Sequence, residues 1–298
     1  MKAGVEAAAG QGGAAFADTT LLVLAHGSRA NEGSAEPARW HAARLRERGL
    51  FASVRECFWQ QEPGWAEVLA ASTTPRVVVV PLFIGEGYFV DDVIPRALGL
   101  KSEGDVEYAR VQVRGASVLI YTRPVGTHPG MTGVLLARAQ DVVMRHPFPW
   151  APRPEELTLI AVGHGTGRTS ASRSAVERQV ERIRARGAYA EVCGAFMEDD
   201  PRIGDVVAAA RCRQVVVVPY FISDGLHVVE DIPVLLGESA ATVRGRLEAG
   251  RSTWRNPTER QGKRIWYAPG IGFEPLLTEV ILERAREALR MTDEGARS

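Results

Sequence analysis

The stretch Leu24-Ala25-His26-Gly27-Ser28 has a near copy, Val162-Gly163-His164-Gly165-Thr166, that lies 138 residues further along the chain. The same register holds without a gap for about 70 residues, and a repeat of that size predicts two homologous units rather than one large domain. We expect a disordered tail over residues 1–17, an N-terminal repeat over 18–148 and a C-terminal repeat over 149–298.

Each copy shows the alternation of strands and helices that is typical of an α/β fold. A first apolar run ends at His-Gly, and a run of four valines predicts a central strand that is buried on both faces. Right-handed crossovers between such strands give a doubly wound, parallel sheet in each copy. The expected strands are 21–25, 52–59, 77–80 and 118–121 in the first copy and 157–163, 190–197, 215–218 and 264–267 in the second, with amphipathic helices over 32–48 and 170–186.

Two segments, 101–115 and 240–262, interrupt the repeat. Residues 244–264 contain seven Lys or Arg against two Glu. This basic stretch is either a solvated loop or a surface that meets anionic groups.

The composition narrows the class of protein. The 298 residues contain 36 Lys or Arg and 36 Asp or Glu, so no overall field attracts nucleic acid or an anionic membrane. Cys57, Cys193 and Cys212 form no Cys-x-x-Cys motif, which indicates small core residues in a reducing compartment and no structural zinc or iron-sulfur cluster. No apolar run is long enough for a signal core or a membrane span, so we expect a cytoplasmic protein.

Histidines stand where the strands of a parallel sheet end, which is the edge at which ligands bind in such folds. If the first and third strands are neighbours, His164 leaves one strand and His227 lies shortly after the other, so both imidazoles can point to one place. Two neutral imidazoles suit a divalent transition metal, and each can also accept a proton. The alternative is a structural histidine in a glycine-rich turn, and the first copy has Phe89 where the second has His227.

Carboxylates gather at the same edge: Glu86, Asp91 and Asp92 in the first copy, and Asp224, Glu230 and Asp231 in the second. Asp231 lies four residues after His227, and its acid is expected to orient that imidazole, as metal-bound histidines usually require. The alternative is an acidic first turn that complements a helix dipole. The turns match neither the dinucleotide fingerprint nor the phosphate-binding loop.

Together, His-Gly-Ser/Thr after the first strand and the string Pro219-Tyr-Phe-Ile-Ser-Asp-Gly-Leu-His227-Val-Val-Glu-Asp231-Ile-Pro233 resemble the sirohydrochlorin chelatases of the CbiX and SirB type. The resemblance covers roughly residues 20–287 in two copies. It implies ATP-independent insertion of cobalt or iron(II), with nickel as a further possibility, into sirohydrochlorin or a related tetrapyrrole during cobalamin or siroheme biosynthesis. It also implies that His164 and His227 bind the metal and help to remove the pyrrole protons.

The resemblance extends to the rest of the site. It implies an active site in the interdomain cleft, with Glu86 of the first copy as a third metal ligand. A large planar ring with a carboxylated rim needs apolar walls and basic margins. Tyr88, Phe89, Leu226 and Trp254 are expected to supply the walls, and Arg29 and Arg168 the margins.

The partners implied are the tetrapyrrole and the metal ion, without nucleic acid or membrane, in a monomer or homodimer. Two further hypotheses stay open at this stage. One is a noncatalytic carrier of tetrapyrrole or metal, and the other is a structural member of a larger assembly that docks through the basic segment.

Overall fold

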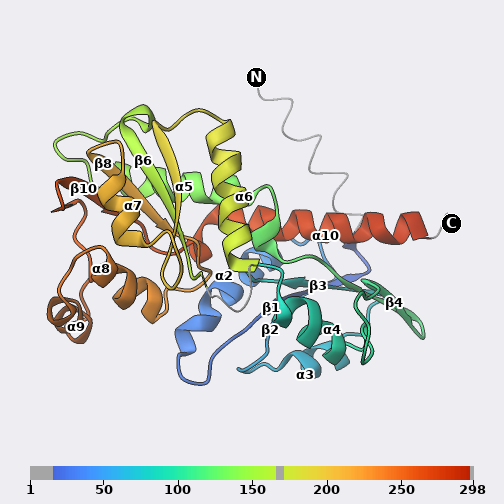
Figure 1. The fold of residues 1–298 in the computed structure, drawn as a ribbon. Helices are drawn as coiled ribbons and strands as arrows, with labels where there is room; N and C mark the ends of the chain where they lie inside the picture. Colours follow the sequence, from blue (N-terminus) through green and yellow to red (C-terminus); the bar gives the residue numbers. More distant parts are fainter. Residues whose placement is uncertain (1–15, 166–170, 296–298) are drawn as a thin grey trace. The chain divides into compact units, whose positions relative to one another are not determined.

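The computed structural model describes residues 16–165 and 171–295, which belong to two compact units (Figure 1). Unit 1 comprises residues 1–128 and 277–298, and unit 2 comprises residues 129–276. Each unit is built on its own five-stranded sheet. None of the described helices has the length and apolar character that a membrane span requires.

The sheet of unit 1 has the strand order β2-β1-β3-β5-β4. The first four of these strands run parallel, and β4 pairs with β5 in the antiparallel direction. The strands are β1 Thr19–Ala25, β2 Ser53–Phe58, β3 Arg76–Pro81, β4 Val111–Arg114 and β5 Ser117–Tyr121. The helices are η2 Glu32–Ala35, α2 Glu36–Glu47, α3 Trp65–Ala70, the π-helix η3 Phe89–Val93, α4 Ile94–Ala97, η4 Val125–Thr127 and α10 Pro275–Gly295, whose first two residues belong to unit 2.

The sheet of unit 2 repeats this arrangement in the order β7-β6-β8-β10-β9. Its strands are β6 Leu157–Gly163, β7 Glu191–Phe196, β8 Gln214–Pro219, β9 Thr258–Arg260 and β10 Lys263–Tyr267. Its helices are α5 Met131–Arg145, η5 Pro154–Glu156, α6 Ala171–Ala185, α7 Ile203–Ala209, the π-helix η6 His227–Asp231, α8 Ile232–Leu235, α9 Ala240–Glu248 and η7 Ile271–Phe273.

The doubly wound parallel sheet predicted for each copy is confirmed for four strands, but its fifth strand is antiparallel. The two segments that interrupt the repeat supply these strands, because each folds back as a hairpin at the sheet edge. In unit 2 the hairpin turns at Gln261 and Gly262, which both have positive φ, as a two-residue turn between twisted strands requires. The two segments therefore supply equivalent edge strands, and the second segment adds helix α9, for which the first, described in full, has no counterpart.

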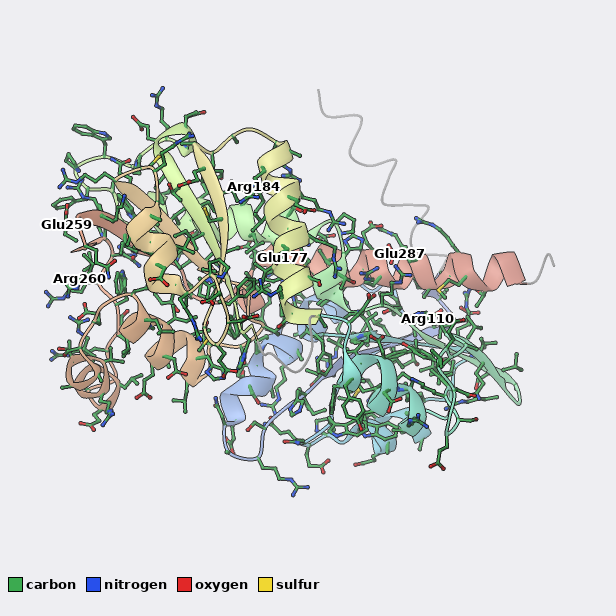
Figure 2. All side chains as sticks on the ribbon, in the orientation of Figure 1. Arg110, Glu177, Arg184, Glu259, Arg260 and Glu287 are labelled. Atoms are coloured by element: carbon green, nitrogen blue, oxygen red, sulfur yellow. The ribbon has the colours of Figure 1, made fainter. Side chains whose placement is uncertain are left out.

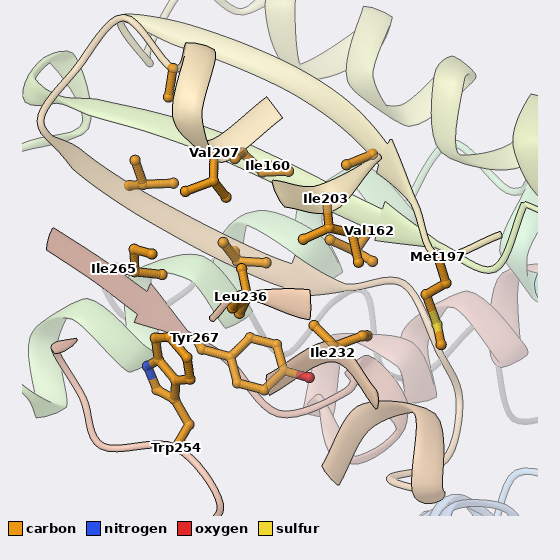
Figure 3. Close-up of a cluster of buried hydrophobic side chains, with 14 of the residues drawn as sticks. Ile160, Val162, Met197, Ile203, Val207, Ile232, Leu236, Trp254, Ile265 and Tyr267 are labelled. Carbon is orange, nitrogen blue, oxygen red and sulfur yellow. The ribbon is translucent and has the colours of Figure 1, made fainter. Parts of the chain in front are cut away.

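The valine runs lie in the middle of the sheets, as predicted. In unit 2, Val215 and Val217 face a buried cluster with Ile160 and Val162 of β6, and α7 and α8 cover that cluster (Figure 3). Val216 and Val218 are also fully buried, on the opposite face of the sheet. A strand that is covered on both faces has little freedom to slip in register, so the loops at its carboxyl end are held firmly.

The compact units exchange the last helix of each sequence copy. Helix α5 belongs to the first copy but contacts β8 and β10, and Thr132 on it donates a hydrogen bond of 2.7 Å to Gln179 of α6. Helix α10 contacts α2 of unit 1, where His41 Nδ1 lies 2.7 Å from the Thr278 hydroxyl. The boundaries of the compact units thus differ from the predicted boundary at 148/149.

The tail predicted for residues 1–17 lies mostly outside the described residues, but Phe16 does not belong to it. Its ring is 1% exposed and lies 4.4 Å from the ring of Phe51. The first core contact is therefore made just before β1.

The three cysteines are free thiols. Cys57 is buried in the core of unit 1, as predicted, and burial raises the pKa of its thiol to about 12. Cys193 and Cys212 are half-buried. A protonated, buried thiol of this kind is inert, which agrees with a packing role for Cys57.

Candidate active site

His164 and His227 are brought together by the pairing of two neighbouring strands. Strands β6 and β8 run in parallel, with Val162 opposite Pro219 at their carboxyl ends. His164 directly follows β6, and His227 begins η6, which follows the loop after β8. The two Nε2 atoms lie 3.2 Å apart. The predicted juxtaposition of the two imidazoles is thus present within unit 2.

The turn that carries His164 depends on glycine. Gly165 has a φ of 74°, and a Cβ at this position would lie 2.5 Å from Cβ of Phe196. Only a residue without a side chain passes so close to the end of β7 in a left-handed conformation. The sharp turn leaves the His164 ring at the sheet edge rather than along the strand.

His227 is oriented by an acid on its own helical turn. In the π-helix η6, His227 and Asp231 lie on the same side, and Nδ1 of the ring is 2.7 Å from Oδ2 of Asp231. The carboxylate accepts a hydrogen bond from Nδ1–H. The lone pair of neutral His227 therefore resides on Nε2 and faces His164. The orienting role predicted for Asp231 therefore has the contact that it needs.

His164 has an acid neighbour as well, and the sequence alone did not single it out. Oε2 of Glu198 lies 3.7 Å from Nδ1 of His164. Partial burial lowers the pKa of His164, and the Glu198 carboxylate opposes that shift. Glu198 comes two residues after β7, the strand next to β6. Its position at the same sheet edge as His164 is the sequence feature that could have identified it.

This arrangement favours a cation between the rings. The hydrogen bond to Asp231 holds a proton on Nδ1 of His227. The Glu198 carboxylate, 3.7 Å from Nδ1 of His164, favours a proton on that atom as well. With both protons on Nδ1, the two Nε2 lone pairs face each other across 3.2 Å. Two imidazole nitrogens that bind one tetrahedral metal at about 2.0–2.1 Å lie about 3.3 Å apart. No group of three or more His, Cys, Asp or Glu that could hold a metal occurs in the described part of the chain. The pair thus offers two nitrogen ligands and leaves the other positions open.

The equivalent place in unit 1 has a different chemistry. Phe89 begins the π-helix η3, and its ring lies 5.1 Å from that of His26 and 5.2 Å from that of Trp59. Nδ1 of His26 lies 2.8 Å from the carbonyl oxygen of Gly27. His26 is therefore a hydrogen-bonded histidine against an aromatic cluster, and it has no imidazole partner like that of His164.

Comparison with known proteins agrees with this architecture. The CbiX family model matches residues 20–142 and again 158–288. The chain belongs to the CbiX family. A probable sirohydrochlorin cobaltochelatase of Halobacterium salinarum is 40% identical over 278 residues, which cover 90% of this chain and 91% of the relative.

Two solved structures resemble the CbiX chain over most of its length. A multi-domain protein of Deinococcus radiodurans with structural similarity to chelatases has a TM-score of 0.71 and 30% identity, and the match covers 90% of this chain but 54% of that protein. SirB from Bacillus subtilis, solved with Fe3+, has a TM-score of 0.65 and 16% identity, with 93% and 97% of the two chains covered. At that identity, the likeness to SirB shows the fold alone.

The remaining predicted residues of this CbiX chain lie in several places. Tyr88 in unit 1 and Leu226 in unit 2 are 68% and 65% exposed, which suits a face that meets a ligand. Arg29 is exposed, and Arg168 lies outside the described residues. Glu86 is half-buried in unit 1, 3.8 Å from Arg123, so its assignment as a metal ligand stays a prediction.

Trp254 contradicts its predicted role as a wall of the ring site. Its side chain is 4% exposed and packs in the core of unit 2, 6.0 Å from the ring of Tyr267. The tryptophan follows α9 and covers the end of β10, so its apolar surface is used for packing.

Most charges of the basic segment are already paired. Arg246 and Arg260 contact the buried Glu238, and Arg264 contacts Glu259, which lies beside Arg260 on β9 (Figure 2). Arg251 and Arg255 are exposed, and neither side chain forms an ion pair or hydrogen bond within the part of the chain that is described. The segment is thus mainly a structural element, with two free cations.

Proposed function

We propose that this chain inserts a divalent metal, cobalt or iron(II), into sirohydrochlorin without ATP, and that His164 and His227 carry the reaction. The observation behind this proposal is the 3.2 Å separation of two Nε2 atoms whose Nδ1 atoms each face a carboxylate. The full-length relative from Halobacterium is named a probable sirohydrochlorin cobaltochelatase, which supports the same reaction here.

The stoichiometry of the reaction matches the pair of histidines. One metal ion enters the ring, and two pyrrole N–H groups each lose a proton. As the metal moves from the imidazoles to the ring nitrogens, each Nε2 lone pair becomes free and can accept one of these protons. The carboxylates of Asp231 and Glu198 stabilise the two imidazolium ions that form, and solvent then removes the protons.

The open coordination positions matter as much as the ligands. A closed four-ligand site would trap the metal, whereas two imidazoles leave room for water and then for ring nitrogens. Both rings lie at the surface of unit 2, with 46% of the His227 side chain and 27% of the His164 side chain exposed. We assign Tyr88, Phe89, Leu226, Arg29 and Arg168 to the binding of the tetrapyrrole, and Glu86 or Glu198 to an additional contact with the metal.

The two imidazole donors indicate a class of metal, the divalent transition metals, but do not select one member of it. Imidazole nitrogen accepts both cobalt(II) and iron(II), and the relatives include a cobaltochelatase by name and a SirB solved with iron. We favour cobalt, because the full-length relative at 40% identity is named for it.

The test is an anaerobic assay with sirohydrochlorin and cobalt(II), iron(II) or nickel(II). The change in absorption of the tetrapyrrole ring reports metal insertion. We expect wild type to exceed the spontaneous rate, His164→Ala and His227→Ala to fall to that rate, and His26→Ala to keep most of the activity. Binding of the ring by wild type without metal insertion would replace this proposal by the carrier hypothesis.

A further inference from the structure

A cavity of about 330 Å³ lies in unit 2 beside the loop that carries His227. Val228 and Val229 line one side, Arg138 and Arg145 of α5 line another, and Trp254 and Tyr267 close the apolar end. Its volume is at the lower end of the range for small-molecule sites. It does not include His164 or His227.

Two buried donors of this cavity have no partner. Arg138 is 9% exposed as a residue, and its Nε makes no hydrogen bond. Trp254 is 4% exposed, and its indole Nε1 also lacks an acceptor, on the side of the ring remote from Tyr267 (Figure 3). A buried donor without an acceptor is unfavourable, so the indole N–H of Trp254 points to a ligand that accepts hydrogen bonds.

The sequence repeat supplies an internal control for Arg138. In the register that places Tyr121 on Tyr267, Arg138 of α5 corresponds to Arg284 of α10. The two terminal nitrogens of Arg284 have partners, because Nη2 donates to the Pro124 carbonyl oxygen and the Thr127 hydroxyl, each at 2.9 Å, and Nη1 donates to Glu287 at 2.7 Å. Its buried Nε lacks a partner among the described residues, as that of Arg138 does, so the two arginines differ at their terminal nitrogens.

Arg138 has lost those acceptors. Phe273 stands where Thr127 would be, and Asp141, which replaces Glu287, pairs with Arg145 at 2.8 Å. The nearest carboxylate to Arg138 is that of Glu274, whose Oε2 lies 3.7 Å from Nε, too far for a hydrogen bond. Asp224, which also lines the cavity, uses Oδ1 to accept the Gly270 N–H.

We propose that this cavity binds the carboxylate of an organic acid, with the Arg138 guanidinium and the Trp254 indole N–H as donors. The apolar walls from Val142, Val228 and Tyr267 suit a short alkyl chain attached to the carboxylate. The carboxylate belongs either to a free small organic acid or to a side arm of the tetrapyrrole, and only the second source rests on the proposed function.

The experiment follows the indole N–H signal of Trp254 in the ¹⁵N-labelled full chain without metal, and Trp254→Phe identifies that signal among the six tryptophans. We expect a saturable shift with sodium propionate that sodium chloride at equal ionic strength does not produce. Arg138→Gln should weaken the binding at least about tenfold, because it removes a charge-assisted hydrogen bond. Arg284→Gln, the matched change in unit 1, should leave it unchanged.

A second titration with sirohydrochlorin separates the two sources. Saturation by the tetrapyrrole at concentrations far below those of propionate assigns the site to a substrate arm, and saturation by propionate alone assigns it to a free acid. No response of Trp254 to either ligand, or an equal response in Arg138→Gln, would overturn the proposal. If Arg138→Gln does not fold, the comparison of propionate with chloride in wild type still decides. His227→Ala should keep the response, so failure of metal insertion is distinguishable from failure of this site.

Discussion

The two units share a backbone and differ in the side chains at one edge. Each has a first strand that ends at His-Gly, a glycine with positive φ and a π-helix after the third strand. Unit 2 has His227, Asp231 and Glu198 at this edge, and the same register gives Phe89, Val93 and Gln60 in unit 1. At these three positions unit 1 therefore lacks the second imidazole. It also lacks both of the carboxylates that face the Nδ1 atoms in unit 2.

The two units show that the backbone fold can be kept while the metal-binding side chains are lost. The π-helix persists in unit 1, where its first residue packs in an aromatic cluster instead of facing a second imidazole. π-Helical turns are often found at functional sites, but here one copy retains the turn without a metal-binding side chain at its first position. The set of His164, His227 and their two acids, rather than the fold, thus marks the unit that we expect to react.

The largest effect should come from His227→Phe, which converts the key position of unit 2 into that of unit 1. Loss of one of two metal ligands should lower kcat/KM about 100-fold or more, roughly 2.7 kcal/mol of transition-state stabilisation. The rate of metal insertion into sirohydrochlorin measures this. His26→Ala, which removes the histidine of the equivalent turn in unit 1, is the matched control, and a comparable loss in that variant would break the comparison.

A smaller loss is expected from Asp231→Val, which installs the residue of unit 1. Without the 2.7 Å contact to Nδ1, His227 is free to change tautomer and orientation. Loss of such an orienting acid typically costs about 10–100-fold in metal affinity or activity. Titration with cobalt(II) measures the affinity, and unchanged binding would show that the carboxylate is not needed.

Substitution of Gly27 or Gly165, the glycines of the two His-Gly turns, should have similar effects on stability but different effects on activity. Gly27→Ala and Gly165→Ala should each destabilise the chain by roughly 1–2 kcal/mol, because both residues have left-handed φ. The added Cβ would also lie 2.7 Å from Cβ of Gln61 or 2.5 Å from Cβ of Phe196. Urea unfolding measures the stability. Activity measured well below the unfolding transition should fall for Gly165→Ala only, and an equal fall for Gly27→Ala would contradict the comparison.

The smallest effect should be a shift in the pH dependence of cobalt(II) binding in Glu198→Gln. This substitution places in unit 2 the residue type that unit 1 has at the equivalent position, Gln60. The carboxylate favours protonated His164, so its removal lowers the pKa of His164 further. The neutral, metal-binding imidazole then persists to lower pH, and the acid limb of cobalt(II) binding should move to lower pH. The shift should be a fraction of a pH unit, because Glu198 is half exposed and screened by water. Gln60→Glu should leave the profile unchanged, and a shift toward higher pH in Glu198→Gln would refute the assignment.

The sequence predicted those features that follow from local pattern and strand adjacency. The valine runs predicted the central strands because few other structures bury consecutive branched side chains on two faces. The neighbouring positions of β6 and β8 then placed His164 beside His227. The contact between His227 and Asp231 followed from their spacing on one helical turn.

Features that depend on long-range packing were not predictable in this way. Strands β4 and β9 are short, and each exists because a hairpin adds it to an existing edge. Glu198 reaches His164 only through the order of β7 and β6 in the sheet. Trp254 was expected at a ligand face, but an aromatic residue in a polar segment serves equally well as the cover of a core. The exchange of α5 and α10 has no local signal at all.

The most direct test of the central claim is the number of imidazole ligands on cobalt bound to the full chain, measured by X-ray absorption of samples with one equivalent of cobalt(II). The account predicts two imidazoles in wild type and in His26→Ala, and at most one in His227→Phe. Retention of two imidazoles in His227→Phe, or their loss in His26→Ala, would contradict the assignment of the metal to unit 2.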